Sequence, residues 1–213
     1  IHPLPVITSA NFASESVCVG TTATSMTASA TTATGTIASY QWYKNTSNSF
    51  LNATLIANET NATFTPPTTT TGTTYYFCEI TNSWGCKATT PVSGAIKVYS
   101  AATISTQPIA ADYCVSPTVQ ATLLSVTAAT NAPGSLTYRW FSNTSNSNSG
   151  GTLIGSATSS SYRPAITAAG TTYYYVEVGN GGPVGCATTT SNAVLINDVE
   201  ILKLPNEFGV NGL

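Results

Sequence analysis

The sequence is poor in charged residues and contains a single histidine. Only 7% of its 213 residues are charged, with 6 Lys and Arg against 8 Asp and Glu, which gives a formal net charge of −2. A chain without a basic excess cannot neutralise many phosphates, so nucleic-acid binding is excluded. The histidine is His2, beside the chain end, and the usual hydrolytic or multi-histidine metal sites have no other histidine to use. The sequence therefore predicts a protein that is not an enzyme and that holds no metal or cofactor.

Long hydrophobic runs and strong helix formers are also missing. No stretch approaches the roughly 18 apolar residues of a membrane-spanning helix, so we expect no membrane insertion. Thr, Ser and Asn occur 39, 24 and 16 times, which is about 37% of the chain. The branched Cβ of Thr favours strands, and a hydrophobic content of 42% is enough for packed cores. These features predict an exported all-β protein.

The chain contains two copies of one unit of about 100 residues. Residues 40–82 align without a gap to residues 138–180 at an offset of 98, with 20 identities in 43 positions. The matches extend to two pairs of cysteines, Cys18 with Cys114 and Cys86 with Cys186. We predict three segments: a first repeat in residues 1–99, a second repeat in residues 100–199, and a tail in residues 200–213.

Within each repeat the hydrophobic pattern alternates with period two, as it does in strands with one buried face. Tyr76, Cys78 and Ile80, for example, fall on one face of a single strand. Roughly seven short strands per repeat, with a Trp on the third and a Tyr on the sixth, describe an immunoglobulin-like sandwich. These marker residues are Trp42 and Trp140 on strand C, and Tyr76 and Tyr174 on strand F. The predicted fold class is all-β, with two tandem immunoglobulin-like β-sandwiches.

The four repeat-matched cysteines predict two disulfides, one within each repeat: Cys18–Cys86 and Cys114–Cys186. Each bond would tie the start of strand B to the turn between strands F and G. Such bonds persist only in an oxidising compartment, which supports export. The fifth cysteine, Cys78, has Val176 as its counterpart in the second repeat. We interpret it as a small buried side chain, with a reactive thiol as the alternative.

Aromatic side chains fall on the outward positions of strands C and F. They are Tyr43, Tyr75 and Phe77 in the first repeat, and Phe141, Tyr173 and Tyr175 in the second. As exposed rows beside Asn and Thr they would suit stacking of sugar rings, and as cross-strand pairs they would stabilise an uncharged sheet. Trp84, in the loop between strands F and G, is a further candidate ligand contact, or else a cover over the predicted Cys18–Cys86 disulfide.

Several short motifs together resemble a known bacterial repeat. They are VCVG, YQWYKNTSNS, GGTLI, PPTTTTGTTYYF and the Gly-Cys that follows strand F. The combination is similar to the immunoglobulin-like module of large surface adhesins of gliding Bacteroidetes, of the SprB type, which leave the cell by type IX secretion. Residues 205–212 also resemble the opening of a type IX sorting domain. The resemblance implies a role in adhesion or gliding at the cell surface.

Three hypotheses for function follow from these patterns. The first is a non-enzymatic structural and adhesive segment, a pair of stalk repeats of a secreted bacterial cell-surface protein, with neighbouring repeats as its partners. The second is a carbohydrate-binding module that contacts surface polysaccharide through the aromatic rows. The third is a subunit of an extracellular filament, in which residues 1–7 and 199–213 add strands to neighbours. Exposed aromatic rows favour the second hypothesis, and rows covered by a loop favour the first.

Overall fold

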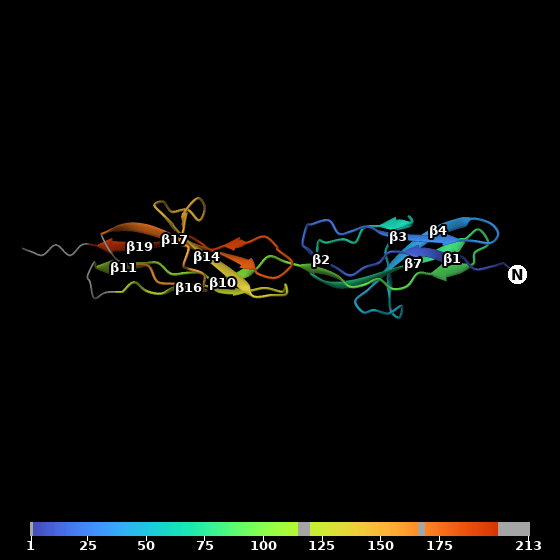
Figure 1. Cartoon of the computed structure of the whole chain (residues 1–213), viewed down its shortest axis with the longest axis horizontal. Helices are drawn as coiled ribbons and strands as arrows, with labels where there is room; N and C mark the ends of the chain where they lie inside the picture. Colours follow the sequence, from blue (N-terminus) through green and yellow to red (C-terminus); the bar gives the residue numbers. More distant parts are fainter. Residues whose placement is uncertain (1, 115–119, 166–168, 200–213) are drawn as a thin grey trace, which may run out of the picture. The chain divides into compact units, whose positions relative to one another are not determined.

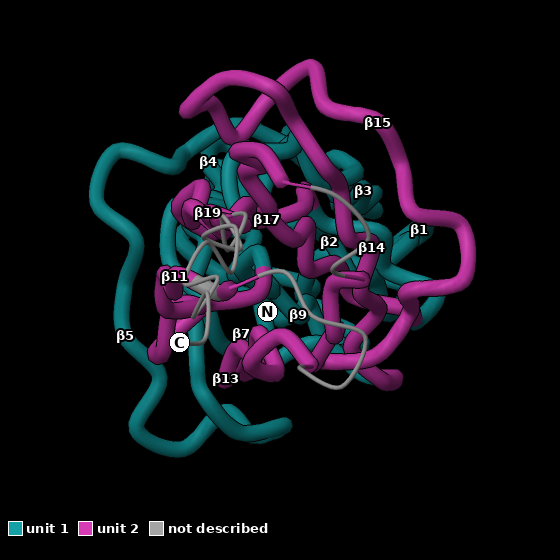
Figure 2. The backbone as a smooth tube through the Cα atoms, turned by 90° about the vertical axis from the view of Figure 1, so that its left-hand side faces the viewer, with its two compact units in different colours: residues 1–101, 131–133, 182–186 teal, residues 102–130, 134–181, 187–213 magenta. Residues whose placement is uncertain are grey.

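The computed structural model of the chain describes residues 2–114, 120–165 and 169–199, in which all regular structure is β-strand (Figure 1). The chain forms two compact units, coloured separately in Figure 2. Unit 1 comprises residues 1–101, 131–133 and 182–186, and unit 2 comprises residues 102–130, 134–181 and 187–213. Each unit contains its own hydrophobic core. The predicted all-β class with two sandwiches is confirmed. The predicted tail, residues 200–213, lies outside the described residues.

Unit 1 is built from two facing sheets. One has the strand order β1-β3-β6, and the other has the order β2-β9-β7-β4-β5 with β8 paired to β7. The strands are β1 (Val6–Ala10), β2 (Glu15–Cys18), β3 (Met26–Thr31), β4 (Ile37–Asn45), β5 (Thr54–Leu55), β6 (Thr63–Phe64), β7 (Gly72–Asn82), β8 (Lys87–Thr89) and β9 (Ile96–Tyr99). In immunoglobulin terms, β3 is strand B, β4 is strand C and β7 is strand F.

Unit 2 repeats this topology with shorter strands in its first sheet. The larger sheet has the order β11-β19-β17-β14-β15, with β18 paired to β17, while β10 pairs β13 and β12 pairs β16. The strands are β10 (Thr103–Thr106), β11 (Ala111–Cys114), β12 (Leu124–Ser125), β13 (Thr127–Ala129), β14 (Leu136–Asn143), β15 (Thr152–Leu153), β16 (Ser161–Tyr162), β17 (Gly170–Asn180), β18 (Thr189–Thr190) and β19 (Val194–Val199).

The period-two pattern of strand F places its apolar side chains in the core. Tyr76, Cys78 and Ile80 are all buried in the cluster between the sheets of unit 1, as predicted. Trp42 pairs with Cys78 across strands β4 and β7, and its side chain is fully buried. Its indole Nε1–H donates a hydrogen bond to the backbone oxygen of Asn61 at 2.8 Å, so the polar atom is satisfied inside the core.

The second core is organised in the same way. Trp140 is fully buried, pairs with Val176 across β14 and β17, and donates its Nε1–H to the backbone oxygen of Ser159 at 2.9 Å. Tyr174 is buried in the same cluster, which confirms the inward face of strand F in both repeats. Burial also raises the pKa of the Tyr174 hydroxyl above its ordinary value.

The first residues of each repeat cross from one sheet to the other. Strand β1 pairs antiparallel with β3, whereas β2 pairs parallel with β9 at the edge of the larger sheet. Cys18 therefore ends an extra edge strand that precedes strand B, and the prediction that it lies at the start of strand B is wrong. Val6 and Ile7, which the filament hypothesis places in a strand added to a neighbour, are already paired with Thr31 and Ala30 of β3 within unit 1.

Candidate functional site

Two stacked aromatic pairs lie on the outer face of the larger sheets. Tyr43 and Phe77 are direct cross-strand partners of β4 and β7, with ring centroids 5.1 Å apart and planes 6° from parallel. Phe141 and Tyr175 occupy the same register in unit 2, with ring centroids 4.9 Å apart and planes again 6° from parallel. The outward positions predicted on strands C and F are therefore brought together in each repeat. Cross-strand aromatic pairs of this kind stabilise a sheet.

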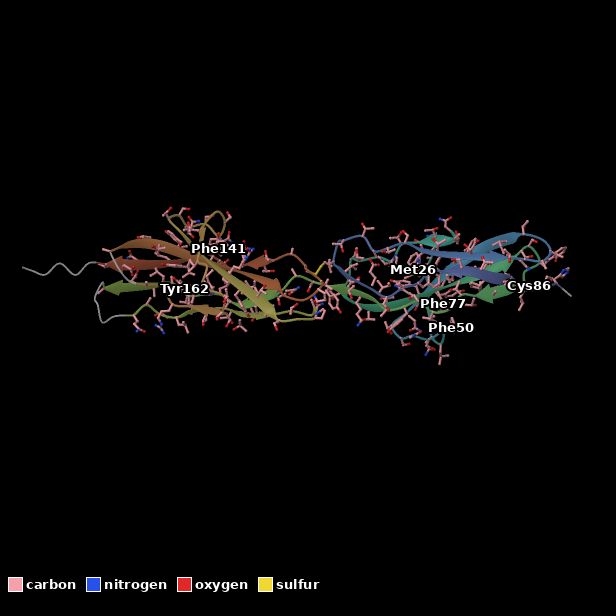
Figure 3. All side chains as sticks on the ribbon, viewed as in Figure 1. Met26, Phe50, Phe77, Cys86, Phe141 and Tyr162 are labelled. Atoms are coloured by element: carbon pink, nitrogen blue, oxygen red, sulfur yellow. A yellow bond between two sulfur atoms is a disulfide. The ribbon has the colours of Figure 1, made fainter. Side chains whose placement is uncertain are left out.

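The connection between strands β4 and β5 folds over the aromatic pair of unit 1. The ring of Phe50 packs edge-on against Phe77 with centroids 4.9 Å apart, and Figure 3 shows the two side chains beside each other. As a result Phe77 is only 6% exposed, although Phe50 itself is 54% exposed. The prediction that Phe77 belongs to an exposed aromatic row is wrong, because a loop of the same repeat covers its ring.

A backbone clamp holds this loop in place. The side-chain amide of Asn45 donates to the backbone oxygens of Ser49 at 2.7 Å and Leu51 at 2.9 Å, and its Oδ1 accepts from Ser47 N at 3.3 Å. Asn143 makes the equivalent bonds in unit 2. The repeated Asn-Thr-Ser-Asn-Ser, which the sequence identifies only as a polar loop, is thus an Asx-type turn that fixes the loop over the sheet.

Tyr175 is covered by a different contact. Its hydroxyl accepts a hydrogen bond from the backbone N–H of Gly151 at 3.0 Å, and its side chain is 2% exposed. The prediction of an exposed row is therefore wrong for Tyr175 also. Tyr43, Tyr75, Phe141 and Tyr173 are half-buried. Neither repeat presents the three exposed coplanar rings that a flat sugar-stacking platform needs.

One depression remains on the aromatic face of unit 1. It has a volume of about 550 Å³ and is lined by Tyr43, Phe50, Ala53, Phe77, Glu79 and Thr89. Its floor is aromatic and its rim carries a carboxylate and a hydroxyl. At one side, Glu79 forms an ion pair with Lys87 at 2.7 Å, and this contact raises the pKa of the lysine. The corresponding Glu177 of unit 2 pairs instead with Arg139 at 2.5 Å. This depression is the candidate binding site.

Trp84 is exposed and does not cover a disulfide. Its indole is 53% exposed and stacks in parallel on His2, with ring centroids 4.1 Å apart and planes 6° from parallel. The loop that carries it is fixed by the buried Asn82, whose Oδ1 accepts from Trp84 N at 3.0 Å and Cys86 N at 2.9 Å. The interpretation of Trp84 as the cover of a Cys18–Cys86 bond is wrong, because that bond is absent.

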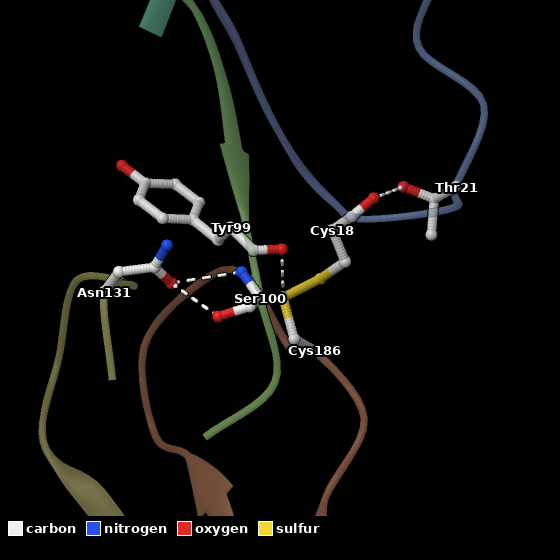
Figure 4. The surroundings of a disulfide bond; sticks show 6 residues. All are labelled: Cys18, Thr21, Tyr99, Ser100, Asn131 and Cys186. Carbon is white, nitrogen blue, oxygen red and sulfur yellow. Dashed lines mark hydrogen bonds between the residues drawn. A yellow bond between two sulfur atoms is a disulfide. The ribbon is translucent and has the colours of Figure 1, made fainter. Parts of the chain in front are cut away.

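The disulfide in the structure joins Cys18 to Cys186, which are 168 residues apart in sequence and have Cα atoms 5.5 Å apart (Figure 4). Cys86 and Cys114 are free, so the predicted pairings Cys18–Cys86 and Cys114–Cys186 are wrong. Both bonded cysteines belong to unit 1, because the segment 182–186 clusters with it. Around the bond, Cys186 Sγ lies 3.8 Å from the backbone oxygen of Tyr99.

Strand length explains why the two cysteines of one repeat do not meet. Cys18 ends β2, which lies beside β9, and β9 pairs with the first residues of β7. Cys86 comes after the last residue of β7, so the two cysteines lie near opposite ends of this strand. The 11 residues of β7, at about 3.3 Å each, place the ends of this strand roughly 33 Å apart. Disulfide formation requires Cα atoms about 4–7 Å apart. The unbroken strand pattern of residues 72–82 is the feature of the sequence that could have excluded the predicted pairing.

The third free cysteine, Cys78, behaves as the sequence predicts. It is fully buried in the core of unit 1, opposite Trp42. Burial raises the pKa of its thiol to about 11, so the thiolate is scarce at neutral pH. The interpretation of Cys78 as a small core side chain is confirmed.

Within residues 2–114, 120–165 and 169–199, no three His, Cys, Asp or Glu side chains gather as metal ligands. In the same part of the chain, no helix is long and apolar enough to span a bilayer.

Both repeats match one protein family, described as Domain of unknown function (DUF8696), over residues 8–100 and 105–199. No curated protein matches the chain. Among solved structures, an I-band fragment of titin is similar with a TM-score of 0.52 and 14% identity, over 94% of this chain and 67% of that one. Extracellular domains 3–5 of Drosophila OTK give a TM-score of 0.50 and 16% identity, over 91% of this chain and 63% of that one. The N-terminal eight immunoglobulin domains of DSCAM give a TM-score of 0.50 and 14% identity, over 93% of this chain and 25% of that one.

These likenesses confirm the immunoglobulin-like fold of both repeats. The chain spans less than two thirds of the OTK fragment and a quarter of the DSCAM fragment. At 14–16% identity, the solved structures establish the arrangement of strands in tandem domains and no more.

Proposed function

We propose that this chain, which belongs through both of its repeats to the family Domain of unknown function (DUF8696), is a non-enzymatic structural and adhesive segment of a secreted bacterial cell-surface protein. The observation that carries the proposal is the Cys18–Cys186 disulfide, which joins the end of β2 in the first repeat to the turn between β17 and β18 in the second. Such a bond persists in an oxidising compartment, which supports a location outside the cytoplasm. The resemblance of the repeat motifs to those of gliding adhesins of the SprB type supports a place in such a surface stalk.

A disulfide in this position changes how the chain carries tension. Force applied at the two chain ends passes from Cys18 directly to Cys186, so the polypeptide between them is bypassed. Strands β3 to β9 and β10 to β17 all lie within the bypassed segment. At about 3.5 Å per extended residue, the bond withholds roughly 590 Å of contour length from the pulled chain. A stalk repeat with this property resists stretching after its sheets have opened.

The covering of the aromatic rows supports the same proposal. Phe77 and Tyr175 stack against their cross-strand partners and are covered by their own loops, which is the arrangement expected of sheet stabilisation. Among the structural neighbours, DSCAM is named a cell adhesion molecule.

Single-molecule stretching of the oxidised chain tests this function. With the disulfide formed, the contour length gained on complete unfolding is expected to be about 590 Å shorter than after reduction, from the 168 bypassed residues. The variant Cys18→Ser should give the longer extension without any reductant. Cys86→Ser removes a thiol that is not bonded and serves as the matched control, with the shorter extension retained. Equal extensions for the oxidised chain and Cys18→Ser would contradict the proposal.

The depression on unit 1 favours a second function, the binding of surface polysaccharide. A sugar ring placed there would meet the face of Phe50 and the polar atoms of Glu79 and Thr89. We expect an array of bacterial and algal polysaccharides to reveal any such ligand as saturable binding. Phe50→Ala should abolish this binding, whereas Leu51→Ala, at the adjacent and 74% exposed position outside the lining, should retain it. Failure of every polysaccharide to bind would exclude this second function and leave the first.

A further inference from the structure

The disulfide joins cysteines that are not equivalent in the repeat. Cys18 is the first matched cysteine of its repeat, and Cys186 is the second matched cysteine of the following repeat. The two matched cysteines left over are therefore one of each kind: Cys86, the second of its repeat, and Cys114, the first of its repeat. Both carry free thiols.

Cys114 lies in the same structural position as the bonded Cys18. Cys18 ends strand β2, which runs parallel to β9, and it is paired in register with Tyr99. Cys114 ends strand β11, which runs parallel to β19, and it is paired in register with Val199. Cys114 is exposed. It has the local backbone setting of a cysteine that forms a disulfide in the other repeat.

Cys86 has the surroundings of the bonded Cys186. Cys186 Sγ lies 3.8 Å from the backbone oxygen of Tyr99, where the chain leaves the first repeat. The Cys86 thiol donates at 3.8 Å to the backbone oxygen of His2, where the chain enters the first repeat. Ile7 of β1 and Ile104 of β10 hold equivalent places in the two repeats, an offset of 97, at which His2 corresponds to Tyr99. Cys86 is half-exposed and lies at the end of unit 1 that holds the chain's N-terminus (Figures 1 and 3).

We propose that Cys114 and Cys86 are the two halves of a head-to-tail disulfide between copies of this chain, with Cys114 of one copy bonded to Cys86 of the next. The bond repeats the Cys18–Cys186 linkage one step along an array of repeats. In this proposal, the partner of each free cysteine is the complementary cysteine of a second copy of the repeat pair. The net charge of −2 per chain gives little repulsion between the copies.

The alternative pairings are unfavourable for identifiable reasons. Cys86 cannot reach Cys18 of its own repeat, because the length of β7 separates them. Cys114 lies beside β19, which pairs with the first residues of β17. Cys186 comes after the last residue of this 11-residue strand, so the length of β17 separates Cys114 from Cys186. Cys78 is buried and its pKa is raised to about 11, so it does not compete for oxidation.

The reaction is a thiol–disulfide exchange with a small disulfide as oxidant. The thiolate of one cysteine attacks oxidised glutathione, which releases one glutathione thiol and leaves a mixed disulfide. The thiolate of the partner cysteine then attacks the protein sulfur and releases the second glutathione. In sum, two protein thiols and one oxidised glutathione give one protein disulfide and two reduced glutathione molecules.

Incubation of the purified, disulfide-containing chain with oxidised glutathione tests this linkage. We expect a ladder of covalent oligomers on non-reducing electrophoresis. In the peptide map of the ladder, Cys86–Cys114 bonds should exceed Cys86–Cys86 and Cys114–Cys114 bonds at least tenfold. Random pairing of two equally reactive thiols would give only twice as many mixed bonds as either identical pair.

Two single variants make the test specific. Cys86→Ser and Cys114→Ser should each stay monomeric alone, and an equimolar mixture of the two should stop at a dimer. Cys78→Val, which carries the side chain found at the equivalent position of the second repeat, should give the ladder of the unmodified chain. Monomers that keep both thiols, an intramolecular Cys86–Cys114 bond, or a random mixture of pairings would overturn the proposal.

Discussion

The hydroxyl of Tyr175 accepts a hydrogen bond from the backbone N–H of Gly151 at 3.0 Å, and the absence of a side chain at Gly151 makes the contact possible. A Cβ at this glycine would lie 2.9 Å from Tyr175 Cε1 and 2.7 Å from the backbone oxygen of Ser142. The first repeat has Ala53 and Phe77 at the two equivalent positions. The repeat with the larger loop residue, Ala53, therefore has a ring without a hydroxyl, Phe77. The repeat with Gly151 has a ring that carries a hydroxyl, Tyr175.

Gly151→Ala should therefore destabilise unit 2. The added methyl forces the loop away from Tyr175 and breaks its hydrogen bond, at a cost of about 1–3 kcal/mol in the free energy of unfolding. Urea unfolding followed by tyrosine fluorescence measures the loss. The double variant Gly151→Ala/Tyr175→Phe, which copies the pair in unit 1, should lose less than the sum of the two single variants. Strict additivity would contradict the coupling between these positions.

Asn45→Ala should release the loop between β4 and β5. The variant removes two amide donors to loop carbonyls, and a net loss of about 1 kcal/mol corresponds to roughly fivefold more frequent opening of the loop. Amide hydrogen exchange of residues 46–53 should accelerate by this factor, while exchange in the core of β7 stays unchanged. Asn48→Ala, at an exposed position of the same loop, is the matched control. Equal acceleration in both variants would show that the clamp does not hold the loop.

The buried thiol of Cys78 should make unit 1 less stable at alkaline pH. Burial raises its pKa to about 11 in the folded state from an ordinary value of 9.0, so the folded state holds this proton more tightly than the unfolded state. The contribution is fully present below pH 9 and is lost as the pH rises from 9 to 11, up to about 2–3 kcal/mol. Urea unfolding across this range measures it. Cys78→Val should lack this part of the alkaline slope, and an unchanged slope would refute the assignment.

Trp140→Phe should test the hydrogen bond inside the second core. The substitution keeps an aromatic ring but leaves the backbone oxygen of Ser159 without its donor and opens a small cavity, at about 2–4 kcal/mol in the free energy of unfolding. Thermal unfolding of the oxidised chain measures the change. Trp84→Phe, at an exposed ring, should leave stability nearly unchanged. A larger loss for Trp84→Phe than for Trp140→Phe would contradict the described core.

Periodicity was sufficient to predict the fold and the core of both repeats. The alternation around Tyr76 and Cys78, and the Trp42 and Trp140 positions, depend on local spacing, which a sequence displays directly. The cover over Phe77 could not be read in the same way. It depends on hydrogen bonds from Asn45 to carbonyls four and six residues away, which decide whether a polar loop stands free or lies on the sheet.

The disulfide partner was predicted wrongly for a related reason. Repeat equivalence identifies which cysteines are comparable, but it does not say whether a bond closes within a repeat or between repeats. That choice depends on which end of the larger sheet each cysteine occupies. After β1 the chain leaves the first sheet, and β2 joins β9 in parallel. This crossing places Cys18 at the end of the larger sheet opposite to Cys86.

The Cys18–Cys186 bond also has a consequence for damage to the chain. A protease that cuts a single peptide bond between these residues, for instance in either of the loops clamped by Asn45 and Asn143, leaves two pieces that the sulfur bridge still connects. Only a second cut outside the bridged segment, or reduction of the bond, would separate the segments before Cys18 from those after Cys186. In the proposed role at a cell surface, the chain would keep its two ends connected after its loops are nicked.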